Sequence, residues 1–134
     1  MIKLLILSIV ISLTGCSSGH SIQSPDGAWI MYRMSGLDLS NKKLMKGMPL
    51  FRFDIIEGKF SGHAGCNQLL STIELSDHSI KFGKILHTEM ACADMEVENA
   101  VLKVLTESTL LYEVNDAELI LTSPDGIEMR FTKE

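Results

Sequence analysis

The stretch that decides the fold reads Phe51-Arg52-Phe53-Asp54-Ile55-Ile56-Glu57-Gly58-Lys59-Phe60. Apolar and polar residues alternate along it, and such alternation places every second side chain on the same face of a β-strand. Glu57-Gly58 interrupts the alternation with the chemistry of a tight turn, because glycine readily adopts a positive φ. We therefore expect β-strands that have one face on a hydrophobic core.

The same alternation recurs towards the C-terminus. The segments concerned are Ile80-Lys81-Phe82, Leu119-Ile120-Leu121 and Ile127-Glu128-Met129-Arg130-Phe131. Ser123-Pro124-Asp125-Gly126 separates the last two segments and has the residues of a tight turn. Residues 119–131 are therefore predicted to form a β-hairpin. The same tetrapeptide stands at residues 24–27, just before Trp29, where we expect the folded domain to begin.

One segment has helical periodicity instead. Between Asp94 and Ser108, five apolar residues fall on one helical face: Val97, Ala100, Val101, Val104 and Leu105. Asp94 can cap the first turn, and Glu96 and Glu98 lie near the positive end of the helix dipole. About eight short strands and one helix predict an α+β domain. We expect a mostly antiparallel sheet, curled or closed into a small barrel, with the single α-helix packed against it.

Length and composition exclude several classes of protein. The chain has 134 residues, enough for one domain but not for a cofactor-binding domain plus a catalytic one. Its net charge of −5 argues against nucleic-acid binding, which needs a basic face, and its 46% hydrophobic content argues against disorder. The sequence has no phosphate-binding loop, zinc-protease helix motif or nucleophile elbow. We therefore expect neither an enzyme nor a bound cofactor.

The N-terminus has the pattern of a secretory signal. Lys3 precedes a mostly apolar run, Leu4 to Leu13, which is too short to cross a bilayer permanently. The run ends in Leu13-Thr14-Gly15-Cys16, which resembles the bacterial lipobox. We expect residues 1–15 to be a cleaved signal peptide, residues 16–26 a lipidated tether and residues 27–134 the domain. An ordinary signal peptide with an incidental cysteine, or a buried core helix, is the alternative.

The lipobox resemblance also implies a location. In lipoproteins of this kind the cysteine carries acyl chains, and more than one chain gives stable membrane anchoring. Ser17 and Ser18 follow Cys16, in place of the aspartate that commonly retains lipoproteins at an inner membrane. We expect a lipid anchor at Cys16 that holds the protein on the periplasmic face of an outer membrane.

Two cysteines remain for the domain itself. An exported protein enters an oxidising compartment, where thiols usually pair, so Cys66 and Cys92 are candidates for a disulfide. A structural zinc site that also uses His63 and His87 is an alternative, although the spacings match no familiar module. A third possibility is that Cys66 is a nucleophile activated by one of the two histidines.

Three other features carry expectations. Met31-x-x-Met34 and Met45-x-x-Met48 pair thioethers that suit Cu(I), although Met31 and Met34 should face opposite sides of a strand and methionine commonly fills cores. Asn67, in a glycine-rich bend, is expected to bond nearby backbone groups rather than to catalyse. Ser35 to Pro49 is predicted to be a loop in which three lysines are exposed: Lys42, Lys43 and Lys46.

Taken in order along the chain, the motifs of this sequence resemble those of the META domain family, which includes the heat-shock lipoprotein HslJ. The most specific elements are Gly65-Cys66-Asn67 and Thr88-x-Met90-Ala91-Cys92, and the resemblance runs from about Gly27 to Thr132. Where the family often has a basic residue after the threonine, this chain has Glu89.

The resemblance implies a compact β domain with a packed helix, an envelope location, and links to heat shock, stress or antibiotic tolerance. It implies no reaction, so the motif residues are interpreted as structural. We therefore expect a non-enzymatic protein that is anchored to the membrane and binds another envelope component, with no nucleic-acid partner. The alternative is a periplasmic inhibitor or ligand-binding lipoprotein, for which the loop from Ser35 to Pro49 is the candidate inhibitory segment.

Overall fold

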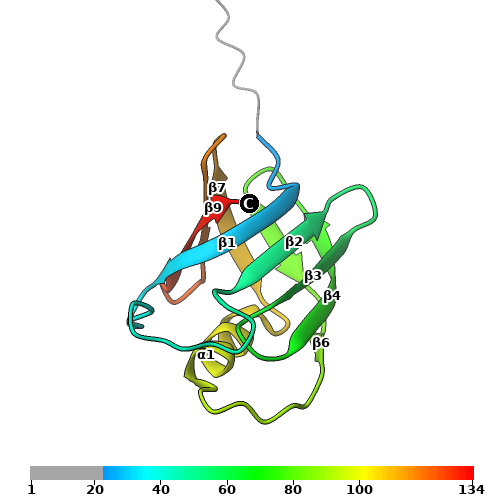
Figure 1. Ribbon diagram of the computed structural model, residues 1–134. Coiled ribbons are helices and arrows are strands. Elements are labelled where there is room, and N and C mark those ends of the chain that lie inside the picture. Colours follow the sequence, from blue (N-terminus) through cyan, green and yellow to red (C-terminus); the bar gives the residue numbers. More distant parts are fainter. Residues whose placement is uncertain (1–22) are drawn as a thin grey trace, which may run out of the picture.

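The computed structural model describes residues 23–134, so the expected signal peptide and Cys16 lie outside the described residues. These residues form nine strands and one helix (Figure 1). The strands are β1 (Gly27–Met34), β2 (Leu50–Asp54), β3 (Lys59–His63), β4 (Gln68–Leu75), β5 (Ser79–Phe82), β6 (Leu86–His87), β7 (Thr109–Val114), β8 (Glu118–Thr122) and β9 (Glu128–Lys133). The helix α1 spans Glu96–Leu105.

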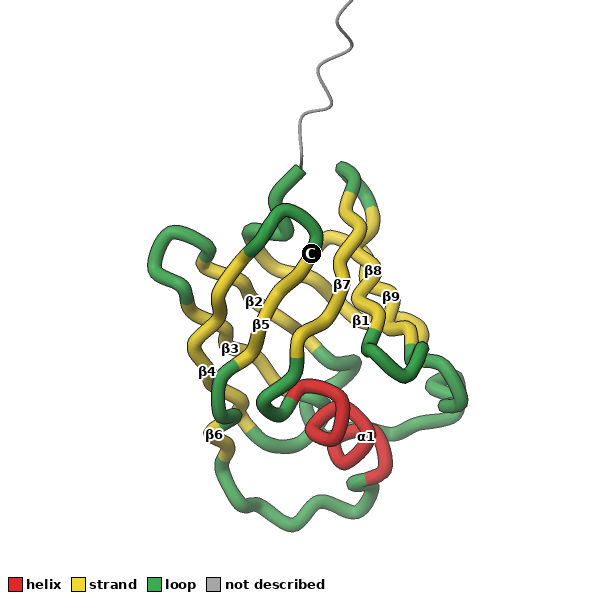
Figure 2. The backbone as a smooth tube through the Cα atoms, turned by 180° about the vertical axis from the view of Figure 1, so that it is seen from behind, coloured by secondary structure: helices red, strands yellow, loops and turns green. Residues whose placement is uncertain are grey.

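All strand pairings are antiparallel, and they close into a barrel. The strand order is β3-β2-β1-β9-β8-β7-β5-β4-β6, and an additional pairing joins β3 to β4. Eight strands therefore form the closed barrel, with the short β6 added to β4. Helix α1 lies across the end of the barrel opposite the one at which residue 23 enters (Figures 1 and 2). The expected α+β small barrel is confirmed.

The predicted strand patterns supply the core. All five phenylalanines of the chain are buried and form one cluster of ring contacts, with centroids 4.9–6.4 Å apart. These are Phe51, Phe53, Phe60, Phe82 and Phe131. Trp29 is also fully buried, and its indole N–H donates to the carbonyl of Pro25 at 2.8 Å. The predicted hairpin at residues 119–131 is β8–β9, with Gly126 in its turn at φ 86°.

Helix α1 is shorter than the predicted segment. It begins at Glu96, whose backbone N–H donates to the side chain of Asp94 at 3.0 Å. It ends at Leu105, because Thr106 takes an extended conformation and its hydroxyl donates to the carbonyl of Leu102. The predicted apolar face is correct, since Val97, Val101, Val104 and Leu105 are buried.

The expectation that Met31 and Met34 face opposite sides of β1 is wrong. The register of β1 against β9 shifts between Met31 and Arg33. This bulge leaves both Tyr32 and Arg33 outside, so Met31 and Met34 both enter the core, where they are 0% and 4% exposed. Strict alternation fails here because a bulge adds a residue to one strand.

The loop from Ser35 to Pro49 is packed more closely than expected. Leu39 is buried, and the Lys46 N–H donates to the carbonyl of Gly65 at 2.9 Å. Lys42, expected to be exposed, forms ion pairs with Asp94 and Glu96 at the start of α1. Its side chain is only 18% exposed, because the ion pairs hold it against the helix.

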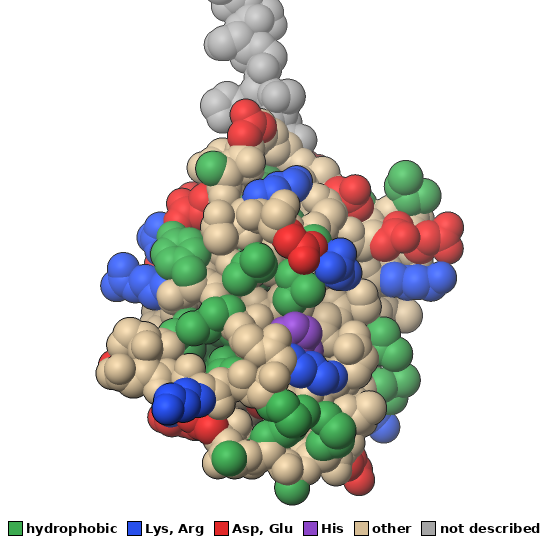
Figure 3. Space-filling view, viewed as in Figure 1, with side chains coloured by type: hydrophobic (Ala, Val, Ile, Leu, Met, Phe, Trp, Pro, Cys, Tyr) green, Lys and Arg blue, Asp and Glu red, His purple; other side chains and the backbone are tan. Residues whose placement is uncertain are grey.

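The surface carries both signs of charge, with apolar side chains in separate patches on the face seen in Figure 3. Within residues 23–134, no helix has the length and apolar character needed to cross a membrane.

Candidate functional site

Asn67 is the centre of a buried hydrogen-bond network. Its side-chain amide donates to the carbonyl of Met90 at 3.1 Å and to the carboxylate of Glu98 at 2.6 Å. Its side-chain oxygen accepts from the Thr88 hydroxyl at 2.8 Å and from the Met90 N–H at 2.7 Å. These four bonds use the full capacity of the amide. Asn67 therefore ties the bend after β3 to the segment before α1.

Glu98 is the residue of this network that sequence reasoning missed. It is 2% exposed, and its second carboxylate oxygen accepts the backbone N–H of Asn67 at 2.6 Å. The interpretation that Glu98 serves the positive end of the helix dipole is therefore incomplete, because its carboxylate is bonded to Asn67. A usable signal was present: Glu98 directly follows Val97, the first buried position of the apolar face. A carboxylate at the edge of a buried helical face needs a polar partner.

The disulfide lies beside this network. Cys66 and Cys92 are joined in the structure, with Cα atoms 6.1 Å apart and a separation of 26 positions in sequence. Cys66 is buried, whereas Ala91 is exposed and Met90 is 42% exposed. The Sδ atom of Met45 lies 3.9 Å from the Sγ atom of Cys92. The two halves of the family motif, residues 65–67 and 88–92, therefore meet at one end of the barrel.

Two glycines near this junction allow neighbouring segments of the chain to approach each other closely. Gly65 has φ 108°, and a Cβ atom there would stand 2.9 Å from the side chain of Leu44. A Cβ atom on Gly62 would stand 2.0 Å from the carbonyl oxygen of Leu50, on the neighbouring strand β2. Backbone atoms cannot withdraw as a side chain can, so Gly62 is the more restricted of the two positions.

The two histidines of the zinc alternative lie at the ends of β3 and β6. The Nδ1 atom of His63 accepts the N–H of Gly65 at 3.3 Å. Burial, chiefly, and nearby Lys46 lower the pKa of His63, while Glu98 acts in the opposite direction. Within residues 23–134, no group of three or more His, Cys, Asp or Glu side chains has the arrangement of a metal site. While Cys66 and Cys92 form a disulfide, neither can act as the thiolate that the zinc and nucleophile alternatives need.

The four methionines of the copper alternative do not share one environment. Met31 and Met34 are in the core, whereas Met45 and Met48 are 62% and 38% exposed in the loop from Ser35 to Pro49. The two pairs therefore do not form a common set of thioethers.

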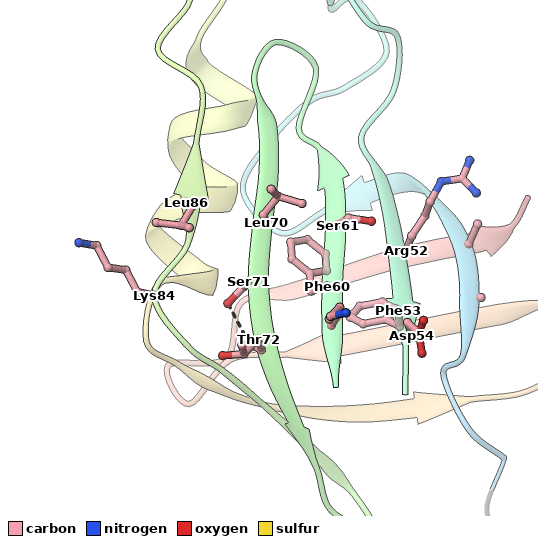
Figure 4. A pocket seen from close by; sticks show the side chains of 13 residues that line it. Arg52, Phe53, Asp54, Phe60, Ser61, Leu70, Ser71, Thr72, Lys84 and Leu86 are labelled. Atoms are coloured by element: carbon pink, nitrogen blue, oxygen red, sulfur yellow. Dashed lines mark hydrogen bonds between the residues drawn. The ribbon is translucent and has the colours of Figure 1, made fainter. Parts of the chain in front are cut away.

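A groove on the outside of the barrel is a second candidate site. It has a volume of about 770 Å³ and crosses the outer face of the sheet that contains β1, β2, β3, β4 and β6 (Figure 4). The register places five of its residues side by side on successive strands: Ala28, Arg52, Ser61, Leu70 and Leu86. We call this site the outer-face groove. Its size is typical of small-molecule binding sites.

Apolar and cationic side chains both line the outer-face groove. Leu70 and Leu86 are 51% and 58% exposed, although large apolar side chains are usually buried in a domain of this kind. A second outward row consists of Asp54, Lys59 and Thr72. Strand alternation identifies outward positions, but the sequence alone does not show that these rows lie over a hollow.

The comparisons with known proteins agree on the fold. An NMR structure of a protein from Burkholderia xenovorans is 19% identical, has a TM-score of 0.64, and matches over 81% of this chain and 82% of that one. A crystal structure of a DUF4847 family protein from Bacteroides vulgatus is 14% identical, has a TM-score of 0.56, and matches over 81% of this chain and 93% of that one. No functionally curated protein sequence matches significantly. The META domain profile matches residues 21–134, and the chain therefore belongs to the META domain family.

Proposed function

We propose that this chain is a non-enzymatic, lipid-anchored protein of the bacterial envelope, which binds another envelope component during heat shock, envelope stress or antibiotic exposure. The observation that carries the binding role is the outer-face groove, where two exposed leucines lie in a hollow of about 770 Å³. Exposed apolar side chains gathered in a concave site are typical of binding surfaces.

The proposed location rests on the sequence. The lipobox-like Leu13-Thr14-Gly15-Cys16 supports an acylated Cys16, and the paired cysteines of the domain suit an oxidising compartment. Replacing Cys16 with Ala is expected to release the protein from membranes into the soluble fraction. If the Cys16→Ala protein still sediments with membranes, the anchor is wrong.

Crosslinking in living cells tests the binding role. A photoreactive amino acid replaces Leu86 in the groove or, as a matched control, Leu111, which is 60% exposed on β7 outside the groove. We expect a discrete adduct of defined mass from position 86 and none from position 111. Equal adducts at both positions, or none at position 86, would contradict a binding role for the groove.

A periplasmic inhibitor is the second candidate, but through a different segment from the one expected. The loop from Ser35 to Pro49 packs on the barrel, whereas Ile56, in the β2–β3 turn, is 94% exposed. An apolar side chain at the tip of a hairpin suits insertion into a cleft. Under this alternative, a photoreactive amino acid placed in the β2–β3 turn also gives an adduct in cells. The change Ile56→Asp abolishes that adduct and leaves crosslinking from position 86 unchanged.

A further inference from the structure

The charge around the outer-face groove differs from that of the whole chain. The chain carries a net charge of −5, yet three cations and one carboxylate line the groove. The cations are Arg52, Lys59 and Lys84, and the carboxylate is Asp54. Among the lining residues themselves, cations therefore outnumber carboxylates.

The three cations are not equally available. Arg52 pairs with Glu134 at 2.9 Å, and Lys59 pairs with Glu57 at 3.3 Å. Lys84 is exposed and has no carboxylate within ion-pair distance among residues 23–134. Lys84 is therefore the groove cation best able to meet the charge of a ligand.

The exposed apolar part of the groove begins at Leu86, two residues after Lys84 in the chain. Leu86 pairs in register with Leu70, and the row then passes Ser61 and Arg52 to Ala28. Figure 4 shows Lys84 on the same segment as Leu86, with its amine pointing away from Leu70, and Arg52 on the opposite side of the groove. Five adjacent strands give this row a length of about 19 Å, since neighbouring strands lie about 4.8 Å apart. The groove thus offers two adjacent exposed leucines, with Lys84 near one end of the row and Arg52 near the other.

We propose that the outer-face groove binds a single-chain amphiphile with a carboxylate head group, which meets Lys84 while its alkyl chain covers Leu86 and Leu70. This ligand class rests on the binding role proposed above and makes it more specific. The occupant is a monomeric fatty carboxylate and not a bilayer surface, because a hollow of about 770 Å³ has the size of a site for one small molecule.

Calorimetric titration with decanoate, below the concentration at which it forms micelles, tests the proposal on the full chain carrying Cys16→Ala. We expect one molecule to bind per chain. The double variant Leu70→Thr/Leu86→Thr should weaken binding by about tenfold or more, because exposed apolar area is lost. Leu111→Thr, at an equally exposed leucine outside the groove, should leave the affinity unchanged.

Head-group charge is tested separately. Lys84→Gln should weaken decanoate binding by about fivefold, whereas Lys43→Gln, in the exposed part of the loop from Ser35 to Pro49, should have no effect. Decyltrimethylammonium, which has the same alkyl chain and the opposite charge, should bind at least about tenfold more weakly than decanoate. Equal binding of the two amphiphiles, equal loss in Leu111→Thr, or absence of decanoate binding would overturn the proposal.

The crosslinking experiment separates this failure from failure of the binding role. If decanoate does not bind but position 86 still gives a discrete adduct in cells, the groove binds something other than a fatty carboxylate. If both experiments fail, the groove has no binding role.

Discussion

The α1 end of the barrel and the outer-face groove use their polar groups in opposite ways. At the α1 end, Asn67 and Glu98 are 2% exposed and hydrogen-bond each other, and no buried side-chain polar atom in residues 23–134 lacks a partner. In the groove, Lys84 is exposed without a carboxylate partner, and Leu86 is 58% exposed. The difference teaches that the polar groups of Asn67 and Glu98 are used up in contacts within the fold. The residues left free to contact a ligand lie elsewhere.

The sharpest test of this contrast is Asn67→Ala. The change removes four side-chain hydrogen bonds and leaves Glu98 buried with one bond from a backbone N–H. We expect the free energy of unfolding to fall by about 3–5 kcal/mol, because a buried carboxylate loses a partner. Urea denaturation measures the loss.

Asn99→Ala is the matched control, because Asn99 lies on the exposed side of the same helix as Glu98. It should change the free energy of unfolding by no more than about 0.5 kcal/mol. Equal losses from the two variants would show that the buried network does not support the fold.

The second largest effect is expected from the disulfide. Joining residues 26 apart restricts the unfolded chain, and the chain-entropy relation gives about 3.5 kcal/mol. The variant Cys66→Ala/Cys92→Ala should lose about this much stability. Mass spectrometry of the unreduced protein should show a peptide that links the two cysteines, whereas two free thiols would refute the bridge.

The features that the sequence predicts differ from those that it misses in the range of the contacts involved. Regular alternation located Phe51, Phe53, Phe82 and the β8–β9 hairpin, because each side chain's face depends only on its position in a strand. The bulge in β1 was not predicted, since it depends on the pairing of β1 with β9. The partner of Glu98 was also missed. Asn67 lies 31 residues away in sequence, and only the closed barrel brings the two side chains together.

The sequence did not predict the groove for the same reason. Its cross-strand row joins residues from five strands, and the register between strands is a property of the folded sheet. The signal peptide and the lipidation of Cys16 remain predictions from sequence.

A smaller effect is expected from Lys42, which fixes the loop from Ser35 to Pro49 to the start of α1. Ion pairing with Glu96 and Asp94 raises the pKa of Lys42, and hydrogen bonds from the Glu96 N–H and Lys42 lower the pKa of Asp94. A lowered carboxyl pKa stabilises the fold above the unfolded value of about 4 and loses this effect as the pH falls through the folded value.

Lys42→Ala should therefore lower the melting temperature at neutral pH, by less than the two variants above, and the difference should shrink at acidic pH and in high salt. Thermal melts measure this, with Lys43→Ala as the control. A melting temperature of Lys42→Ala equal to that of Lys43→Ala under all conditions would show that the ion pairs do not hold the loop.

A weaker pH dependence is expected from His63. Burial lowers the pKa of its imidazole, so the unfolded chain takes up a proton at a higher pH than the folded protein does. Stability from His63 is thus present above the unfolded pKa of about 6.5 and is lost as the pH falls through the folded value. Denaturation between pH 7.5 and 5.5 should show a decline that His63→Gln reduces. An unchanged decline in His63→Gln would assign the effect to other groups.

Substitutions in the outer-face groove should have the smallest effect on stability. This is the clearest difference expected between the groove and the α1 end of the barrel. Lys84→Gln and Leu86→Thr should each change the free energy of unfolding by no more than about 0.5 kcal/mol, because both side chains are exposed. The same variants are expected to weaken decanoate binding. A change that removes binding and spares stability marks a residue kept for contact with a ligand. Losses as large as that of Asn67→Ala would instead mean that the groove supports the barrel.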